Sequence, residues 1–283
     1  MPELPEVETV RRGIEAHVVG RTVEQVEVGR ERTVRRTSRR AVIDGLTGTT
    51  VLAANRRGKY LLLPLDSGDE VMIHLRMSGR VLVGPAGSPR LPHTHVVAHL
   101  AATPERPAAE MHFVDPRTFG EVVVFDPTNL AVEMPELTRL GVDPIVDDLS
   151  RARLRRIVLA RSRQLKALLL DQHVIAGIGN IYSDEILHAA RLRHDRPSDS
   201  LTGQQITRLH REMQRVLREA IEAGGSTLAD TQYVDIEGAG GWFQLSHRVY
   251  DRAGQPCLTC GKAQIKRVVA AGRSTCFCPF CQR

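Results

Sequence analysis

The sequence predicts an α+β protein of several domains, with antiparallel strands first, helices next and a cysteine-rich segment at the end. Three observations support this prediction. Short apolar runs broken by Gly, Pro and Asp fill residues 22–126, the apolar period becomes helical after residue 150, and all five cysteines lie between residues 257 and 281. The 283 residues suit about two domains of ordinary size.

A helix is expected at residues 5–18. Pro5 suits the first helical position, and Glu6 and Glu8 place negative charge in the first turn, where the helix dipole favours it. Apolar residues then recur at helical spacing, at Val7, Val10, Ile14 and Val18.

An antiparallel sandwich or barrel is expected next. Apolar runs separated by turn residues are typical of short strands, and several at this spacing favour such a fold. The runs lie at residues 22–28, 50–56, 59–65, 70–75, 80–84, 95–100, 110–115 and 121–126.

A domain boundary is expected at residues 127–150, which contain three prolines and five acidic residues. Beyond it, Ser150 is a candidate helix cap, and Thr202 with Gln205 fits a capping box. Helices are expected after Ser150, at 163–175, at 181–190 and from Thr202 to Gly224. Residues 226–247 are rich in Gly and predict a loop. The predicted domains are therefore an N-terminal domain at 1–135, a linker at 136–150, a helical domain at 151–247 and a zinc segment at 248–283.

The composition indicates an ordinary soluble protein with a basic surplus. Lys and Arg number 39 against 33 acidic residues, a formal charge of +6, which leans towards a polyanionic partner. No run approaches the roughly 20 apolar residues of a membrane helix, and the acidic N-terminus lacks the apolar core of a secretory signal. We therefore expect a cytoplasmic protein with no membrane partner.

The cysteines predict a structural zinc site. Two Cys-x2-Cys knuckles separated by 17 residues can supply four thiolates in a tetrahedron, from Cys257, Cys260, Cys278 and Cys281. Four thiolates leave no open position, so this zinc would hold the fold rather than catalyse. Cys276 is the cysteine that the two knuckles do not use, and a competing Cys276-x-Cys278 pairing remains open. Basic residues between the knuckles, Arg273 among them, form either a phosphate contact or a solvated face.

The N-terminus suggests covalent chemistry. Initiator Met1 is normally trimmed before a small residue, which would leave Pro2 with a secondary amine, part of it unprotonated near neutral pH. Such an amine can attack the C1′ carbon of a deoxyribose and form a cationic iminium. Glu3 and Glu6 are carboxylates within reach for proton transfer. The simpler alternative is that Glu-Leu-Pro-Glu only begins a helix.

Six short motifs in order resemble the bacterial formamidopyrimidine-DNA glycosylases. They are MPELPEVETVRRGIE at the start, RRGKYLLL at 56–63, HLRMSG at 74–79, DPRTFG at 115–120, GIGNIYSDE at 177–185 and the terminal knuckles around GRSTCFCPFCQ. The resemblance implies an N-terminal β-sandwich, a helical helix–two-turn–helix domain with a lesion-capping loop, and a C-terminal zinc β-hairpin, with DNA in a cleft between the domains.

The resemblance also implies an activity. The enzyme would be a bifunctional base-excision-repair DNA glycosylase and AP lyase that removes oxidised purines such as 8-oxoguanine and formamidopyrimidines. Its partner would be double-stranded DNA with oxidised bases or abasic sites, and it would act as a monomer with one structural Zn²⁺ and no catalytic metal or organic cofactor.

The matching positions give each site residue a role. Pro2 would form the Schiff base, Glu3 would be the general acid/base, Lys59 would assist β-elimination and Arg273 δ-elimination. Because the damaged base must be flipped out, three side chains would fill the void in the duplex, namely Met77, Arg117 and Phe119. Further DNA contacts would come from His74, His93, Arg117, Arg161, Lys166 and Asn180.

Some positions depart from the family pattern. Arg76 stands where Gly is usual, and it would either add a DNA contact or alter the wedge. Arg161 replaces a common Lys, Ala239 a Lys, Trp242 a Tyr and Cys276 often a Phe, so lesion preference is the property most open to change.

Other activities remain as alternatives. One is an endonuclease VIII-like glycosylase for oxidised pyrimidines, although its members usually begin with Pro-Glu-Gly. Another is a non-catalytic zinc DNA-binding protein, whose expected loss of Pro2, Glu3 or Lys59 is not seen. A proline-based tautomerase would be far smaller and need no zinc hairpin.

Overall fold

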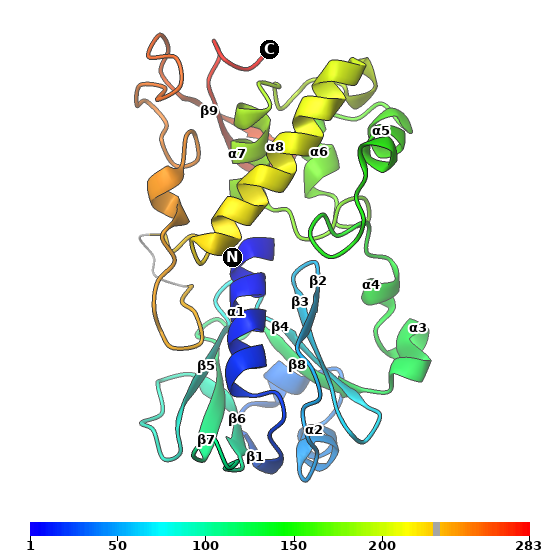
Figure 1. The fold of residues 1–283 in the computed structure, drawn as a ribbon, viewed down its shortest axis with the longest axis vertical. Coiled ribbons are helices and arrows are strands. Elements are labelled where there is room, and N and C mark those ends of the chain that lie inside the picture. The colour runs from blue at the N-terminus through cyan, green and yellow to red at the C-terminus, as the bar shows by residue number, and fades with distance from the viewer. Residues whose placement is uncertain (229–232) are drawn as a thin grey trace. The chain divides into compact units, whose positions relative to one another are not determined.

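The structure is a computed structural model that describes residues 1–228 and 233–283 (Figure 1). The chain falls into two compact units, and each is discontinuous in sequence. Unit 1 comprises Met1–Arg139 and Ala223–Trp242, and unit 2 comprises Leu140–Glu222 and Phe243–Arg283.

Unit 1 begins with helix α1 (Leu4–His17), shown in blue in Figure 1 and one residue earlier than expected at each end. A capping box starts it. The Glu3 side chain accepts the Glu6 backbone N–H, and the Glu6 side chain accepts the Glu3 N–H at 2.8 Å. The helix contacts β2 and β3 and buries its apolar stripe in the core of the unit.

Two four-stranded antiparallel sheets form the body of unit 1, in the orders β1-β6-β7-β5 and β2-β3-β4-β8. Both sheets contribute to one apolar core, so the predicted N-terminal β-sandwich is confirmed. The strands are β1 (Val23–Val28), β2 (Asn55–Arg57), β3 (Tyr60–Pro64), β4 (Glu70–His74), β5 (Arg80–Pro85), β6 (Thr94–Leu100), β7 (Ala109–Val114) and β8 (Glu121–Phe125).

Short helices that the sequence did not reveal interrupt this unit. The largest is α2 (Arg39–Leu46), which Ser38 caps by accepting the Ala41 N–H at 3.1 Å, and which buries Val42 and Leu46. Its two buried residues are too few for a visible helical period in a polar context. The others are η1 (Glu31–Val34), η2 (Pro127–Asn129), α3 (Leu130–Glu133) and α4 (Pro135–Thr138).

The segment Ala223–Trp242 packs in unit 1, whereas the sequence grouped it with the helical domain. The reason is burial. Tyr233 and Ile236 belong to the core of the sheets, and the Ile236 carbonyl accepts the Val83 N–H at 2.8 Å. Apolar contacts thus return this part of the chain to the N-terminal unit.

Unit 2 is mainly helical. Thr202 and Gln205 form the predicted capping box of α8, with Thr202 N–H to Gln205 Oε1 at 2.9 Å. The helix α6 is shorter than expected because Asp171 accepts the His173 N–H and turns the chain. The helices are α5 (Arg151–Leu159), α6 (Leu165–Leu170), α7 (Asn180–Ala189), η3 (Ser198–Ser200), α8 (Gly203–Glu222) and η4 (Phe243–Ser246).

A hairpin of β9 (Lys266–Ala270) and β10 (Arg273–Phe277) ends the chain. Ala271 and Gly272 form its two-residue turn, both with positive φ, at 50° and 68°. β10 contacts α7 within unit 2. Among the described residues, no helix has the length and apolar character needed to cross a membrane.

Candidate functional site

The N-terminal residues are held in a fixed arrangement. Pro2 and Glu3 are buried immediately before α1, and Glu3 is its N-cap. The Glu6 carboxylate accepts the N–H of Glu3 and, at 2.8 Å, the N–H of Ser226. The two residues predicted to react and to transfer protons therefore lie side by side, beside a carboxylate fixed from two directions.

Lys59 lies in the turn between β2 and β3, buried, after Gly58 with φ of 59°. The side chain of Arg56 is fully buried and donates to Glu8 Oε2 and to the Gly58 carbonyl, both at 2.9 Å. Glu8 belongs to α1, so a buried ion pair joins the helix that begins at Glu3 to the turn that carries Lys59.

The arginines beside Glu8 stabilise its ionised form. Burial alone would raise the pKa of Glu8, but Arg56 and Arg11 outweigh it and hold the pKa below its usual value. The sequence indicated Glu8 only as a helix-start charge and did not single out Arg56. No local pattern marks the pair, because 48 residues separate the partners.

Two loops of unit 1 carry the residues predicted to fill the void in the duplex. Met77 lies between β4 and β5 with 38% of its surface exposed, and Phe119 lies between β7 and β8 with 40% exposed. Arg117 is exposed, and its guanidinium carbon lies 5.3 Å from the centre of the Phe119 ring. Large apolar side chains held in solvent in this way are suited to enter a base stack.

Asp115, which sequence reasoning did not identify, joins the two loops. Its buried carboxylate accepts the Ser78 hydroxyl at 2.6 Å and the Gly120 N–H at 2.7 Å. It also accepts the N–H of Arg117 at 3.1 Å. One side chain thus fixes the backbone on both sides of Phe119 and the residue after Met77.

We expect Asp115→Asn to loosen both loops. An amide accepts fewer of these hydrogen bonds and leaves a buried donor or acceptor unsatisfied, at a cost of about 1–3 kcal/mol in unfolding free energy. Chemical denaturation measures that cost. Asp44→Asn, in an exposed pair on α2, is the control and should change stability by less than about 0.5 kcal/mol. Equal effects of the two changes would contradict a joining role for Asp115.

The two histidines predicted to contact DNA, His74 and His93, differ in their surroundings. His74 is buried at the end of β4, and its Nδ1 accepts the Arg76 N–H at 2.9 Å. Burial, then the charge of Arg76, lowers the pKa of His74 well below its usual range, so the ring is neutral with its proton on Nε2. His93 is exposed with φ of 69°, and its carbonyl accepts the Asp115 N–H at 3.0 Å.

In unit 2, Asn180 is the first residue of α7, and the dipole at the start of a helix favours an anion. Gln172, not identified from sequence, shapes the turn before it by donating to the Ile178 carbonyl and accepting the Gly177 N–H, both at 2.8 Å. Asn180 Oδ1 is buried and has no hydrogen-bond partner among the described residues. Arg161 is exposed.

Lys166 does not fit the phosphate-binding role expected of it. Its side chain is 0% exposed, and its Nζ donates to Asp184 Oδ1 at 2.6 Å. Asp184 Oδ2 also accepts the Cys276 N–H at 2.8 Å. A buried, paired ammonium presents no charge to DNA here. We therefore assign Lys166 to the attachment of β10 to α6 and α7.

We expect Lys166→Met to destabilise the protein by about 3–5 kcal/mol, because it leaves the Asp184 carboxylate buried without its counter-charge. Burial already raises the pKa of Asp184 from 3.8 to about 7, against the effect of Lys166. The native carboxyl then holds a proton that the unfolded chain has lost, so stability falls as pH rises across this interval. The loss of unfolding free energy caused by Lys166→Met, measured by chemical denaturation, should thus be larger at pH 8 than at pH 5. Lys166→Met/Asp184→Asn should recover much of it, and a pH-independent loss would contradict the assignment.

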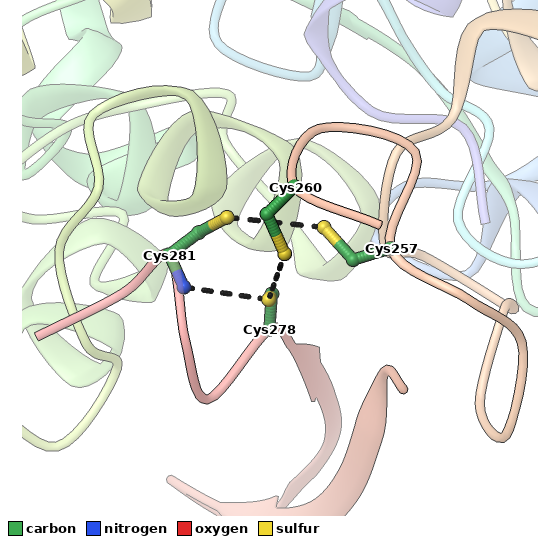
Figure 2. A group of neighbouring side chains, drawn as sticks. All are labelled: Cys257, Cys260, Cys278 and Cys281. Atoms are coloured by element: carbon green, nitrogen blue, oxygen red, sulfur yellow. Dashed lines mark hydrogen bonds between the residues drawn. The ribbon is translucent and has the colours of Figure 1, made fainter. Parts of the chain in front are cut away.

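The four predicted zinc ligands lie together. Cys257, Cys260, Cys278 and Cys281 have all their sulfurs within 4.8 Å of one another (Figure 2). The Cys257–Cys281 and Cys260–Cys278 sulfur pairs are 3.9 and 3.8 Å apart. A tetrahedral zinc with bonds of about 2.3 Å spaces its sulfurs about 3.8 Å apart. The donor set and its spacing fit one structural zinc.

Backbone groups support these sulfurs. The Lys262 N–H points at Cys260 Sγ and the Cys281 N–H at Cys278 Sγ, both at 3.4 Å. The Lys262 N–H is the main cause that lowers the pKa of Cys260 to about 7. Cys276 is buried on β10 outside the four-sulfur group, and Arg273 is exposed beside the hairpin turn.

Comparison with known proteins decides the family. Three family models match in order: the formamidopyrimidine-DNA glycosylase N-terminal domain at residues 1–122, the formamidopyrimidine-DNA glycosylase H2TH domain at 140–232, and a zinc finger found in FPG and IleRS at 254–283. The chain belongs to the formamidopyrimidine-DNA glycosylase family. The resemblance seen in the motifs is thereby confirmed, as are the helix–two-turn–helix and zinc segments of the predicted fold.

Individual formamidopyrimidine-DNA glycosylases match over the whole chain. The Salinispora arenicola protein of that name is 44% identical over 100% of this chain and 96% of its own length. The crystal structure of the Thermus thermophilus MutM (Fpg) protein covers 99% of this chain and 98% of its own, with a TM-score of 0.86 and 42% identity. A complex of Lactococcus lactis Fpg with abasic-site DNA covers 99% of both chains, with a TM-score of 0.88 and 31% identity. These relatives support the main prediction and not the endonuclease VIII-like alternative.

Proposed function

We propose that this protein is a bifunctional DNA glycosylase and AP lyase that removes oxidised purines from double-stranded DNA. The observation that carries the proposal is the link from α1 to the β2–β3 turn. Through Glu8, Arg56 and the Gly58 carbonyl, it fixes the segment bearing Pro2 and Glu3 to the segment bearing Lys59. A nucleophile, a carboxylate and an amine on one rigid frame suit Schiff-base chemistry.

The proposed first step forms a bond from the Pro2 nitrogen to C1′ and breaks the bond from C1′ to the base. The base leaves with the bonding electrons and a proton. The C1′–O4′ bond then breaks, Glu3 supplies a proton to O4′, and the positive charge rests on the iminium nitrogen. Loss of a C2′ proton expels the 3′ phosphate, which we assign to a step assisted by Lys59. A second elimination, assisted by Arg273, removes the C4′ proton and expels the 5′ phosphate. Water then hydrolyses the iminium, which frees the Pro2 amine and releases the sugar remnant as an aldehyde.

The remaining residues are proposed to hold the DNA. His74 would donate from a neutral Nε2–H, and His93, Arg161 and Asn180 would contact phosphates. Met77, Arg117 and Phe119 would occupy the space left by the flipped base. Residues 1–135 would form the catalytic domain together with Ala223–Trp242, which pack in unit 1. The rest of 151–247 would form the helical domain and 248–283 the zinc finger, with 136–150 as linker. The enzyme would act as a monomer in the cytoplasm, at the nucleoid.

Borohydride trapping tests the proposal. Purified protein is incubated with a duplex containing one 8-oxoguanine opposite cytosine, and intact mass establishes whether Met1 is absent. A covalent adduct with Met-trimmed protein is the expected result. No adduct with Met1 absent and zinc bound would overturn the proposal. A parallel duplex with thymine glycol separates it from an oxidised-pyrimidine enzyme, which would prefer that substrate.

A further inference from the structure

Arg76 has a backbone conformation that its side chain does not favour. It lies immediately before Met77 with φ of 52°, in the left-handed region where a residue other than Gly costs roughly 1–2 kcal/mol. Its guanidinium donates to Glu121 Oε1 at 3.0 Å. Such a conformation persists only where the surrounding structure holds it in place.

Glu121 is a meeting point for two segments of unit 1. Its carboxylate, 2% exposed, accepts from Arg76 on the β4–β5 loop and from Arg35 and Arg36 beyond η1. The Arg36 Nε lies 2.6 Å from Glu121 Oε2. A buried carboxylate shared by three guanidiniums is held tightly, since each forms a charge-assisted hydrogen bond.

Arg35, together with Arg32 of η1, also holds the loop that carries Phe119. Arg32 donates to the Thr118 carbonyl at 3.2 Å, and Arg35 donates to the carbonyls of Phe119 at 3.3 Å and Gly120 at 3.4 Å. Glu121 follows Gly120 directly. The Arg76–Glu121 contact therefore connects the Met77 loop to a frame that already fixes the Phe119 loop. This connection is separate from the hydrogen bonds that Asp115 accepts from Ser78, Arg117 and Gly120.

We propose that Arg76 is a positioning residue that, through Glu121, holds Met77 in the orientation needed to enter the duplex beside the flipped base. The proposal rests on the function proposed above. Arg76 acts through Glu121 and the loop backbone, and it does not touch the reacting atoms. It contributes to the step in which Met77 enters the space left by the flipped base.

Arg76→Gly tests this with little risk to the fold, because Gly adopts positive φ without strain. The expected result is a fall of about tenfold to a hundredfold in the single-turnover rate of 8-oxoguanine excision, since a misplacement of about 1 Å costs up to about a hundredfold. The rise in fluorescence of a 2-aminopurine next to the lesion should slow equally. KM and affinity for undamaged duplex should stay unchanged, and the variant should remain folded. Arg40→Ala, which removes one exposed charge from α2, is the control and should alter none of these.

Three further variants separate positioning from other roles. Arg76→Lys keeps the charge beside Glu121 and should restore part of the rate. Glu121→Gln should slow the same step, and Arg76→Gly/Glu121→Gln should be no slower than the slower single variant. Additive losses would overturn the proposal. The proposal would also be overturned if Arg76→Gly weakened the affinity for damaged and undamaged DNA equally and reduced the slope of log affinity against log salt concentration by about 0.9. That result is the one expected of a residue that only contacts a phosphate.

One measurement is independent of catalysis. With ¹³C-methyl methionine, the Met77 signal of DNA-free protein is identified by its loss in Met77→Leu. In Arg76→Gly this signal should move towards that of a freely rotating methionine, and an unchanged signal would overturn the proposal. If the unmodified protein traps no 8-oxoguanine substrate, the proposed function fails, and this signal still decides whether Arg76 positions Met77.

Discussion

Protein that retains Met1 should give no borohydride-trapped adduct and no base excision, while Met-trimmed protein from the same gene gives both. In the retained form the Pro2 nitrogen is an amide, whose lone pair is delocalised into the carbonyl and cannot attack C1′. We expect a loss of at least about a thousandfold, since losing a covalent nucleophile costs up to about a millionfold. Trapping on matched 8-oxoguanine duplex, with intact mass for each preparation, makes the measurement.

Protein that retains Met1 also serves as the control for DNA binding. Glu3 and Glu6 keep the capping box of α1 with Met1 present, so the fold and lesion binding should survive. An adduct of full strength from Met1-containing protein would move the nucleophile to another amine. Lys59 would be the first to test, because its turn is joined to α1 through Arg56.

Replacing Cys278 should have the second large effect. Cys278→Ser removes one of four sulfurs that fit a single zinc, and the terminal hairpin has few buried residues of its own. Structural zinc contributes about 10–16 kcal/mol of apparent binding free energy in small zinc peptides, so the hairpin should unfold when the site is broken. We expect zinc content well below one per chain and cleavage reduced by more than about a hundredfold.

Cys276→Ser, two residues earlier and on β10, is the matched control. Cys276 is buried outside the sulfur group, and burial raises the pKa of its thiol, which makes it inert. This variant should keep one zinc and most of its activity. Loss of zinc in Cys276→Ser and its retention in Cys281→Ser would assign the ligands to the Cys276-x-Cys278 pairing instead.

The sequence predicted the elements whose signals are local. Short apolar runs between turn residues placed the strands β1 to β8, although the run at 50–56 begins five residues before β2. The Thr202–Gln205 capping box appears where its spacing indicated. The zinc ligands followed in the same way, because two knuckles of fixed spacing form one site. The short helix α2 escaped because only Val42 and Leu46 face the core.

Contacts between distant residues could not be predicted in this way. Ser78 and Asp115 are 37 residues apart, and Lys166 and Asp184 are 18 apart. Lysine is almost always exposed in folded proteins, so a motif match gave Lys166 a surface role that its burial excludes in this structure. The motifs therefore indicated which residues carry the chemistry. The residues that hold them in place could be identified only from the three-dimensional structure.

The return of Ala223–Trp242 to unit 1 has a consequence for synthesis on the ribosome. Tyr233 and Ile236 complete a core whose other members lie before residue 125, and Ser226 completes the hydrogen bonding of Glu6. More than four-fifths of the chain must therefore emerge before the N-terminal unit can close. A fragment that stops at Arg139 would leave apolar surface open, and it should aggregate or recruit chaperones rather than fold alone.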